Sequence, residues 1–171
     1  WDNYPVNDAK PAMHLGPVLN RDRDLCEVIE GYMSNPMCSQ NEINRIPMLT
    51  CADYAYNPAA YDPARSIGQS IVHLADSRAQ REVLRGLVEA YVGMIIGGRA
   101  DTGYNAVRDQ YGRIAAVPHS HQAAQAYIGF VEQLLARLKE VFPDRYAATK
   151  KTIEDDIAWM KLRYAEKYTG Q

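Results

Sequence analysis

The longest amphipathic stretch of the chain is residues 120–142, which run SHQAAQAYIGFVEQLLARLKEVF. Its apolar residues recur at spacings of three and four, which is the period of one face of an α-helix. They are Tyr127, Val131, Leu134, Leu135, Leu138 and Val141. Pro143-Asp144 follows directly, and a proline at this point cannot continue the helix. We therefore expect one long helix over residues 120–142 with a single buried face.

Two more helices are expected before this stretch, because their start signals are explicit. Asp62-Pro63 is an N-cap followed by proline at the first helical position, so a helix should run over residues 63–75. Ser77 and Gln80 have the spacing of a capping box and open a second helix. Gly97-Gly98 should end that helix, since glycine is the usual C-terminal stop. Its apolar face would comprise Val83, Leu84, Leu87, Val88, Tyr91 and Ile95.

A last helix should follow the Pro143-Asp144 break and run to about Tyr168. Its inner face would be Ile153, Ile157, Met160 and Tyr164. Residues 99–118 are ambiguous and predict at most a short helix near residues 104–111. Short loops between amphipathic helices are typical of antiparallel bundles. We therefore predict such a bundle over residues 62–171.

Residues 1–63 differ in composition from the rest of the chain. They hold seven of the nine prolines and a net charge of −5, from nine acidic and four basic residues, which predicts a region rich in loops. Residues 27–33, EVIEGYM, predict one β-strand. One strand cannot form a sheet alone, so either its partners lie upstream of Trp1 or the segment is not a strand in the isolated chain. Residues 39–57 have a helical pattern, but Pro47 predicts a helix that is kinked or starts late.

The overall composition excludes several classes of protein. With 171 residues, 47% hydrophobic and 23% charged, the chain has a normal globular composition rather than a disordered one. No apolar run approaches the roughly 20 residues of a membrane-spanning helix, so we expect no membrane span. A net charge of −2 gives no electrostatic reason to expect a nucleic acid partner. The chain begins at Trp1 rather than at methionine, which predicts a piece of a longer protein.

Neither the cysteines nor the histidines have the spacing of a metal site. The cysteines are odd in number and are interpreted as core thiols, with one disulfide among them as the alternative. They are Cys26, Cys38 and Cys51. His119 and His121 would diverge on a helix, because residues two positions apart do not share a face. No metal is therefore expected.

The most informative stretch for function is residues 1–8, Trp-Asp-Asn-Tyr-Pro-Val-Asn-Asp. It places an aromatic ring, two amides and two carboxylates on a segment that Pro5 stiffens. Carboxylates and amides can bridge neighbouring hydroxyl groups, and an indole face can cover an apolar patch, so this set suits a polyhydroxylated ligand. The alternative is a capped turn in which asparagine and aspartate side chains bond their own backbone.

Four blocks of the first region are specific in their order and spacing. They are WDNYPVND at 1–8, HLGP at 14–17, GYMSNPM at 31–37 and ADYAYNP at 52–58. Together they resemble glycoside hydrolase family 84, the β-N-acetylglucosaminidases that include bacterial hyaluronidase-like enzymes and protein O-GlcNAcases. The helical region resembles, with weaker motifs, the helical domain that follows the catalytic barrel in bacterial members.

This resemblance implies a fold. The family's catalytic domain is a (β/α)8 barrel with its site at the C-terminal ends of the strands. Residues 1–61 would be the C-terminal segment of that barrel, made of a loop, one strand and one helix. Residues 62–171 would be the helical bundle. The expected fold class is therefore mainly α, with an incomplete barrel followed by an antiparallel bundle.

The resemblance also assigns sugar-binding residues at the barrel mouth. Trp1 would line the pocket for the N-acetyl group. Asn3 and Asn35 would hydrogen-bond the sugar, and Asp8 would bind the outer hydroxyls of its terminal ring. The implied partners are glycans or glycoproteins that contain N-acetylglucosamine, together with the upstream part of the same barrel.

The chemistry implied by the resemblance is substrate-assisted and needs no cofactor. The substrate's 2-acetamido oxygen attacks the anomeric carbon, one aspartate polarises the acetamide, and an adjacent aspartate is general acid and base. That aspartate pair belongs to an earlier strand, upstream of Trp1, so this chain supplies no catalytic residue. The intact protein would be a retaining β-N-acetylglucosaminidase, and the isolated chain should be inactive. A secreted bacterial enzyme is implied by the resemblance alone.

Several other polar residues have structural explanations. Asp155-Asp156 lies inside a predicted helix and is interpreted as a solvated face rather than as a catalytic pair. His14 either lines the loop of its block or packs structurally, and His73 is a structural helix residue. Asp53-Tyr54 should fix the helix after the predicted strand against the bundle, with a direct ligand role as the alternative.

Two other classes of function remain open from the sequence. The helical region could be a protein- or glycan-interaction module without catalytic activity, which its basic excess and its tyrosines allow. The whole protein could also be a sugar-binding protein that has lost catalysis.

Overall fold

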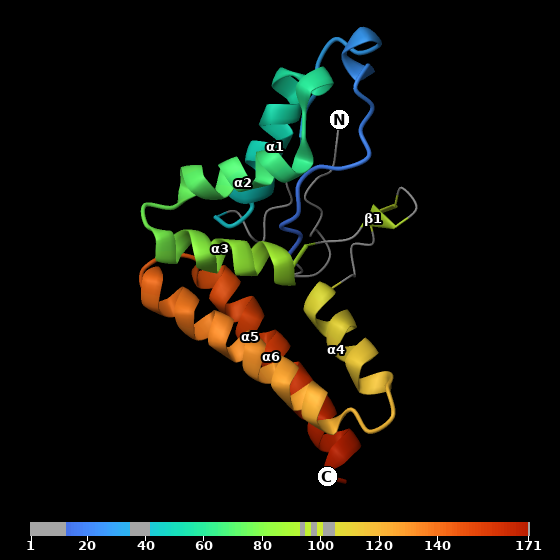
Figure 1. Ribbon diagram of the computed structural model, residues 1–171, viewed down its shortest axis with the longest axis vertical. Coiled ribbons are helices and arrows are strands. Elements are labelled where there is room, and N and C mark those ends of the chain that lie inside the picture. The colour runs from blue at the N-terminus through green and yellow to red at the C-terminus, as the bar shows by residue number, and fades with distance from the viewer. Residues whose placement is uncertain (1–12, 35–41, 93–94, 97–98, 101–104, 171) are drawn as a thin grey trace. The chain divides into compact units, whose positions relative to one another are not determined.

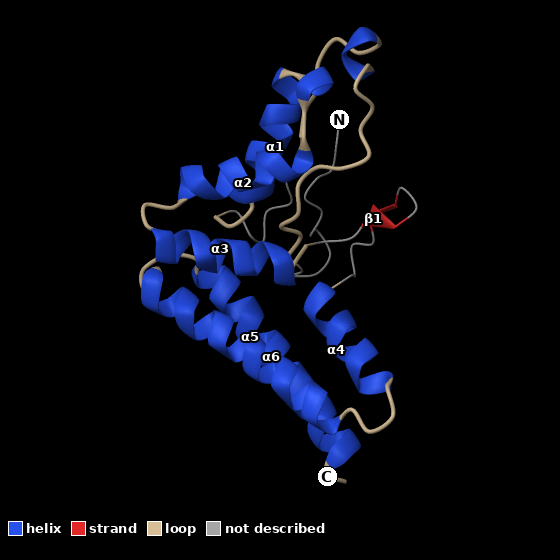
Figure 2. Ribbon diagram, viewed as in Figure 1, coloured by secondary structure: helices blue, strands red, loops and turns tan. Residues whose placement is uncertain are grey.

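The computed structural model describes residues 13–34, 42–92, 95–96, 99–100 and 105–170. It is mainly helical, as the sequence predicts (Figures 1 and 2). The α-helices are α1 Arg45–Tyr56, α2 Pro63–Leu74, α3 Arg78–Ala90, α4 Ala106–Ala116, α5 His121–Val141 and α6 Ala147–Tyr168. The other described elements are the 3-10 helices η1 Leu25–Glu27 and η3 Pro58–Ala60, and the strands β1 Ile95–Ile96 and β2 Arg99–Ala100.

The contacts divide the chain into two units, Trp1–Tyr104 and Asn105–Gln171. In the first unit α1 packs on α2, and α2 packs on α3. In the second unit α4, α5 and α6 pack against one another. This division does not test the expected boundary between residues 61 and 62, which stays a prediction. In the part of the chain that the structure describes, no helix is both long and apolar enough to span a bilayer.

Helices α2 and α3 begin where their start signals predict. The Asp62 side chain accepts a hydrogen bond from the Arg65 backbone N–H at 2.7 Å, and proline follows as the first helical residue. The Ser77 hydroxyl accepts from the Gln80 backbone N–H at 3.2 Å. The Gln80 side chain reaches back to the Asp76 backbone N–H at 2.8 Å, one residue before the cap. Both caps satisfy backbone donors that lack a partner in a first helical turn.

The expected end of the second of these helices is wrong. Helix α3 ends at Ala90 instead of continuing to Gly97-Gly98, and Ile95 lies in a strand. Strand β1 pairs antiparallel with β2, with Ile96 opposite Arg99. The sequence Gly97-Gly98 between two short segments favours a β-hairpin, and this preference outweighs the helical spacing of Ile95. Gly97-Gly98 itself lies outside the described residues.

The first region shows one confirmed and one corrected expectation. Helix α1 starts late, at Arg45, so that Pro47 lies in its first turn, where a missing backbone donor costs nothing. The predicted strand over residues 27–33 is not formed. Residues 25–27 are the 3-10 helix η1, and residues 28–33 have no regular structure. Of the two alternatives, the segment is therefore not a strand in this chain, because no neighbouring strand is there to pair with it among the described residues.

The second unit has the amphipathic core that its sequence predicts. The buried residues of α5 include Val131, Leu134, Leu135 and Leu138, and those of α6 include Ile153, Ile157 and Met160. Lys139 of α5 pairs with Glu154 of α6, and Glu132 pairs with Lys161. This order of pairs shows that the two helices run antiparallel, side by side (Figure 1). The ambiguous segment 99–118 contains α4, which is longer than the short helix expected there.

Candidate functional site

The four predicted sugar-binding residues lie outside the described part of the chain. They are Trp1, Asn3, Asp8 and Asn35. The structure does describe residues 13–18, which begin five residues after Asp8, and residues 32–34, which directly precede Asn35. The candidate site is therefore built from these two flanks and from the helices that hold them.

Residues 13–18 lie almost entirely inside the first unit. Met13, Leu15 and Val18 are each at most 1% exposed. The Leu15 backbone N–H donates to the Tyr91 carbonyl at 2.8 Å, and the Gly16 N–H donates to the Val92 carbonyl at 3.1 Å. A segment without a helix or strand of its own is thus paired along its backbone with the residues that follow α3.

A cluster of tyrosines holds both flanks against α1. Tyr54 of α1 contacts the rings of Tyr32 and Tyr61 edge to face, with centroids 5.3 and 5.4 Å apart. The Tyr54 hydroxyl donates to the Asp22 carbonyl at 2.7 Å, and the Tyr61 hydroxyl donates to the Val18 carbonyl at 2.8 Å. These Tyr54 contacts all lie before the predicted bundle, which begins at residue 62, so the expectation that Asp53-Tyr54 fixes this helix against the bundle stays a prediction. Because Tyr32 lies three residues before Asn35, this cluster holds the flank of a predicted sugar-binding residue.

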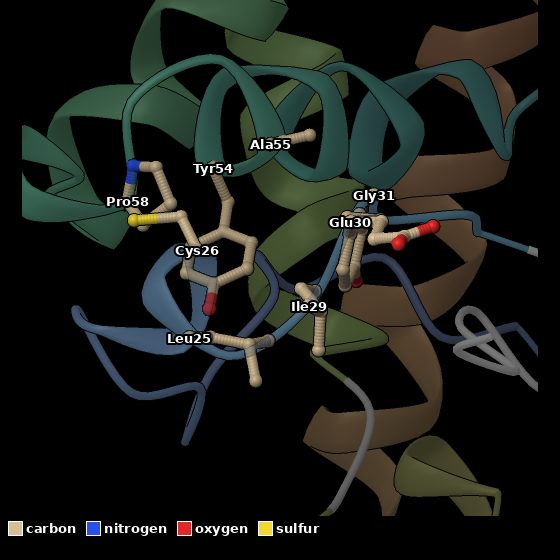
Figure 3. Close-up of a pocket in the computed structure, with 9 residues that line it drawn as sticks. Leu25, Cys26, Ile29, Glu30, Gly31, Tyr54, Ala55 and Pro58 are labelled. Atoms are coloured by element: carbon tan, nitrogen blue, oxygen red, sulfur yellow. The ribbon is translucent and has the colours of Figure 1, made fainter.

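A small pocket opens beside this cluster (Figure 3). Its volume is about 190 Å³, and its walls come from η1, the irregular residues after it, and the end of α1. In Figure 3 the side chains of Leu25, Cys26 and Ile29 lie around the Tyr54 ring. Its walls are largely apolar, and its volume is below the roughly 300 Å³ at which ligand pockets usually begin. The pocket does not form a sugar site by itself.

Burial raises the pKa of Tyr61 to about 12, because the phenolate would lose its hydration beside the core. The folded state therefore holds the proton of Tyr61 above the usual pKa of 10.0, at which the unfolded chain releases it. Stability is complete below pH 10 and should fall as the pH rises from about 10 to about 12. Tyr61→Phe should remove this alkaline component and cost about 1 kcal/mol for the lost bond to Val18. Urea unfolding across this pH range measures it, and an unchanged pH dependence in the variant would contradict the assignment.

Asp53 and His73 belong to a separate pocket between α1 and α2. This pocket has a volume of about 180 Å³, and Leu49, Ser66, Gln69 and Ser70 also line it. Asp53 is partly buried, and His73 is exposed on α2, as a structural helix residue can be. His14 is 4% exposed, which matches the packing alternative rather than an open loop position.

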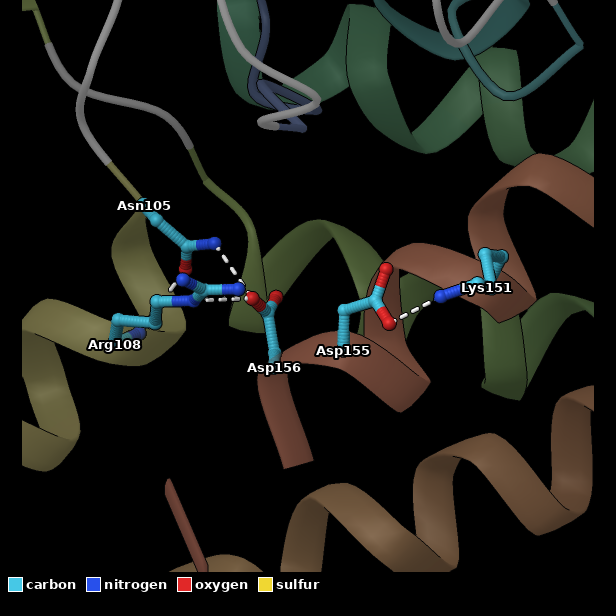
Figure 4. Close-up of polar contacts among 5 residues, drawn as sticks. All are labelled: Asn105, Arg108, Lys151, Asp155 and Asp156. Carbon is cyan, nitrogen blue, oxygen red and sulfur yellow. Dashed lines mark hydrogen bonds and ion pairs between the residues drawn. The ribbon is translucent and has the colours of Figure 1, made fainter. Parts of the chain in front are cut away.

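The interpretation of Asp155-Asp156 is half wrong (Figure 4). Asp155 is exposed and pairs with Lys151, as a solvated face predicts. Asp156 is fully buried, and its carboxylate accepts from Arg108 Nε at 2.7 Å and from Asn105 Nδ2 at 2.9 Å. The reason is helical spacing: position 156 is three residues after Ile153 and shares its buried face.

The Asp156 network is structural. Asn105 is also the N-cap of α4, since its side chain accepts from the Arg108 backbone N–H at 3.0 Å. One carboxylate of α6 thus binds the first turn of α4 through two side chains. Among the described residues, no group of three or more histidine, cysteine, aspartate or glutamate side chains could hold a metal.

The expectation that the cysteines are core thiols is confirmed for one of them and wrong for another. Cys51 is a buried thiol, as expected, but Cys26 is exposed, so its interpretation as a core residue is wrong; neither is in a disulfide. Cys38 lies outside the described residues.

His121 Nε2 lies 2.5 Å from the Tyr164 hydroxyl, which connects the start of α5 to α6.

Comparison with known proteins identifies the class of the chain. The sequence model of a glycosidase family, described as beta-N-acetylglucosaminidase, matches residues 1–89. This match spans the predicted sugar-binding residues, both flanks, helices α1 and α2, and all of α3 except its last residue. The chain therefore belongs to the β-N-acetylglucosaminidases of glycoside hydrolase family 84.

Solved structures share the fold at low sequence identity. A mutant of the O-GlcNAc hydrolase of Thermobaculum terrenum matches 94% of this chain with a TM-score of 0.58 and 20% identity. CpGH84B matches 95% of this chain with a TM-score of 0.61 and 21% identity. The chain spans 36% of the first of these chains and 29% of the second.

Proposed function

We propose that the chain is part of a retaining β-N-acetylglucosaminidase that removes terminal N-acetylglucosamine from glycoconjugates. In this proposal, residues 1–61 complete a (β/α)8 barrel and supply sugar-binding groups, and the catalytic aspartate pair comes from an upstream strand. The observation that carries the proposal is the family match over residues 1–89, which contains Trp1, Asn3, Asp8 and Asn35.

The exposure of apolar side chains in the first region supports a missing neighbour. Val28 is 79% exposed, Met33 is 59% exposed and Tyr56 is 90% exposed. Soluble proteins seldom leave apolar side chains of one region uncovered together, and such surfaces usually meet another surface. The upstream part of the barrel would cover these side chains and would pair with residues 27–33, which have the sequence of a strand and no partner strand among the described residues.

The proposed roles of the sugar-binding residues and of the upstream aspartates follow from the chemistry of each group. The Asp8 carboxylate can accept hydrogen bonds from sugar hydroxyls, and the amides of the two asparagines can both donate and accept. An indole can pack on the N-acetyl methyl group. These contacts bind and orient the ring so that its own acetamide oxygen faces the anomeric carbon. The upstream aspartates would then polarise the acetamide and move the proton of the leaving group.

The intact enzyme should hydrolyse 4-nitrophenyl N-acetyl-β-D-glucosaminide, whereas the 171-residue chain alone should not. NMR of the first product should show the β-anomer, because two successive displacements at the anomeric carbon retain configuration. No hydrolysis by the intact enzyme, or an α-configured first product, would overturn the proposed function. Turnover by the isolated chain would contradict the upstream position of the catalytic pair.

A further inference from the structure

We propose that a groove between helices α5 and α6 is an interface between two copies of this chain. The groove has a volume of about 400 Å³, and all the residues that line it belong to these two helices. It therefore lies wholly within the second unit of the chain. It is separate from the predicted sugar-binding residues, so its role does not depend on the proposed function.

The same eight-residue pattern forms both walls of this α5–α6 groove. Residues 132–139 of α5 read EQLLARLK, and residues 154–161 of α6 read EDDIAWMK. Each wall has glutamate at its first position, leucine or isoleucine at its fourth, alanine at its fifth and lysine at its eighth. These four positions recur at spacings of three and four, so they share one face of a helix, and they are the positions that line the groove.

The four charged side chains alternate in sign around the groove. Because the helices are antiparallel, the glutamate of each wall lies beside the lysine of the other. Lys139 Nζ lies 2.7 Å from Glu154 Oε1, and Lys161 Nζ lies 2.6 Å from Glu132 Oε1. Each of these side chains is still between 42% and 58% exposed, so it can also contact a second surface. Two acids and two bases leave the rim without net charge, which favours a partner surface that is itself balanced in charge.

The floor of the groove is apolar and has room for an opposing side chain. Leu135 and Ile157 are each 8% exposed and close the floor between the helices. Ala136 and Ala158 lie beside them at exposed positions, and their short side chains let the ridges of another helix enter. An opposing helix pair would therefore remove apolar surface from water at the centre of the contact, with the charged side chains around it.

A second copy of the same groove matches this arrangement. Two identical faces that meet are related by a two-fold axis in the plane of contact. An axis that runs across the helices sets Glu132 opposite Lys139 of the second copy, and an axis that runs along them sets Glu132 opposite Lys161 of the second copy. In both orientations every acid of one copy faces a base of the other, and the apolar floors meet. The two α5–α6 pairs would together form a bundle of four helices.

The test exchanges the charges of the rim in the intact enzyme and measures the dissociation constant by sedimentation equilibrium. The wild-type enzyme should reach twice the mass of one chain. Lys139→Glu with Lys161→Glu makes the rim entirely acidic, and Glu132→Lys with Glu154→Lys makes it entirely basic. Each variant should raise the dissociation constant at least about 100-fold, because like charges then face each other across the interface. An equimolar mixture of the two variants should recover the doubled mass, since acidic and basic rims attract.

The matched control is Arg78→Glu with Arg113→Glu. It reverses the same number of charges and also breaks two exposed ion pairs, but both residues lie outside the groove. This variant should keep the wild-type dissociation constant. A monomeric wild-type enzyme, rim variants that still dimerise, or a mixture that stays monomeric would each overturn the proposal.

A neutral variant decides the matter if the rim variants do not fold. Ala136→Gln with Ala158→Gln places longer side chains over the floor of the groove. Both positions are exposed, and glutamine has a high helix propensity, so this variant should fold like the wild type. Its dissociation constant should rise about tenfold or more, because the floors can no longer meet. A wild-type dissociation constant for this variant would also overturn the proposal.

Discussion

Replacing Arg108 by methionine should lower the free energy of unfolding by about 3 kcal/mol, the lower end of the range for breaking a buried ion pair. The Asp156 side chain is 1% exposed, so without the guanidinium its charge stays buried, although the Asn105 amide still donates to it. The variant also loses the contact of Arg108 with the Trp159 ring, whose centroid is 5.3 Å away. The remaining Asn105 bond keeps the loss from being larger.

Three further variants test this prediction. The free energy of unfolding of each is measured by urea unfolding, followed by Trp159 fluorescence. Arg78→Met is the matched control, because Arg78 is 92% exposed in an i,i+4 pair worth about 0.2–0.5 kcal/mol. Asp156→Asn should cost about 1–2 kcal/mol, less than Arg108→Met, since Arg108 is 36% exposed and can turn to water. The double variant that combines Arg108→Met with Asp156→Asn should be more stable than Arg108→Met alone, because it leaves no buried charge. If the losses of the two single variants simply added up in the double variant, the buried Asp156 charge would not explain the loss in Arg108→Met.

Replacing Asp8 by alanine in the intact enzyme should reduce kcat/KM for 4-nitrophenyl N-acetyl-β-D-glucosaminide about 100-fold. A hydrogen bond to a charged group contributes about 1.5–3 kcal/mol, and each 1.4 kcal/mol is a factor of ten. Asp8→Asn keeps an acceptor of the same shape and should lose about tenfold, because the charge is removed but the bond is not.

Asp155→Ala is the matched control for this experiment. Asp155 is an exposed carboxylate on α6, paired only with Lys151 one turn away, and its removal should leave kcat/KM within about twofold. Thermal unfolding of each variant separates lost binding from lost folding. If Asp8→Ala retained the wild-type kcat/KM, Asp8 would not be a sugar-binding residue.

Local sequence signals predicted the helices well because their causes are local. Asp62-Pro63 and Ser77 define helix starts through bonds that span only three residues. The spacing of apolar residues over 120–142 predicts α5 to within one residue at each end. The late start of α1 follows from the single position of Pro47.

Expectations failed where a distant segment decided the outcome. Helical spacing places Asp156 on the buried face of α6, but its partners Arg108 and Asn105 lie about 50 residues away, and no local pattern reveals that pairing. The strand predicted at 27–33 needs a neighbouring strand that the described chain does not offer. The end of α3 is set by competition with a hairpin and by the pairing of Tyr91 and Val92 with residues 15 and 16.

The ligand class was predicted from the residue types of the candidate site, and it stays a prediction because residues 1–8 lie outside the described part of the chain. Residue types at positions 1–8 indicated a hydroxylated ligand, and the family match includes them. The contacts of the flank at residues 13–18 were not predictable, because the backbone groups of Leu15, Gly16 and Val18 bond to partners that are far away in sequence. The only sequence signal was Gly16-Pro17, a pair that usually marks a turn.

The pairing of residues 15–16 with residues 91–92 has a consequence for chimeric enzymes. If residues 62–171 were replaced by the helices of a relative, residues 13–18 would pair with a foreign chain segment, and a Cβ in place of Gly16 would prevent that pairing. Successful grafts should therefore transfer residues 13–18 together with the helices, although residues 19–61 separate the two in sequence.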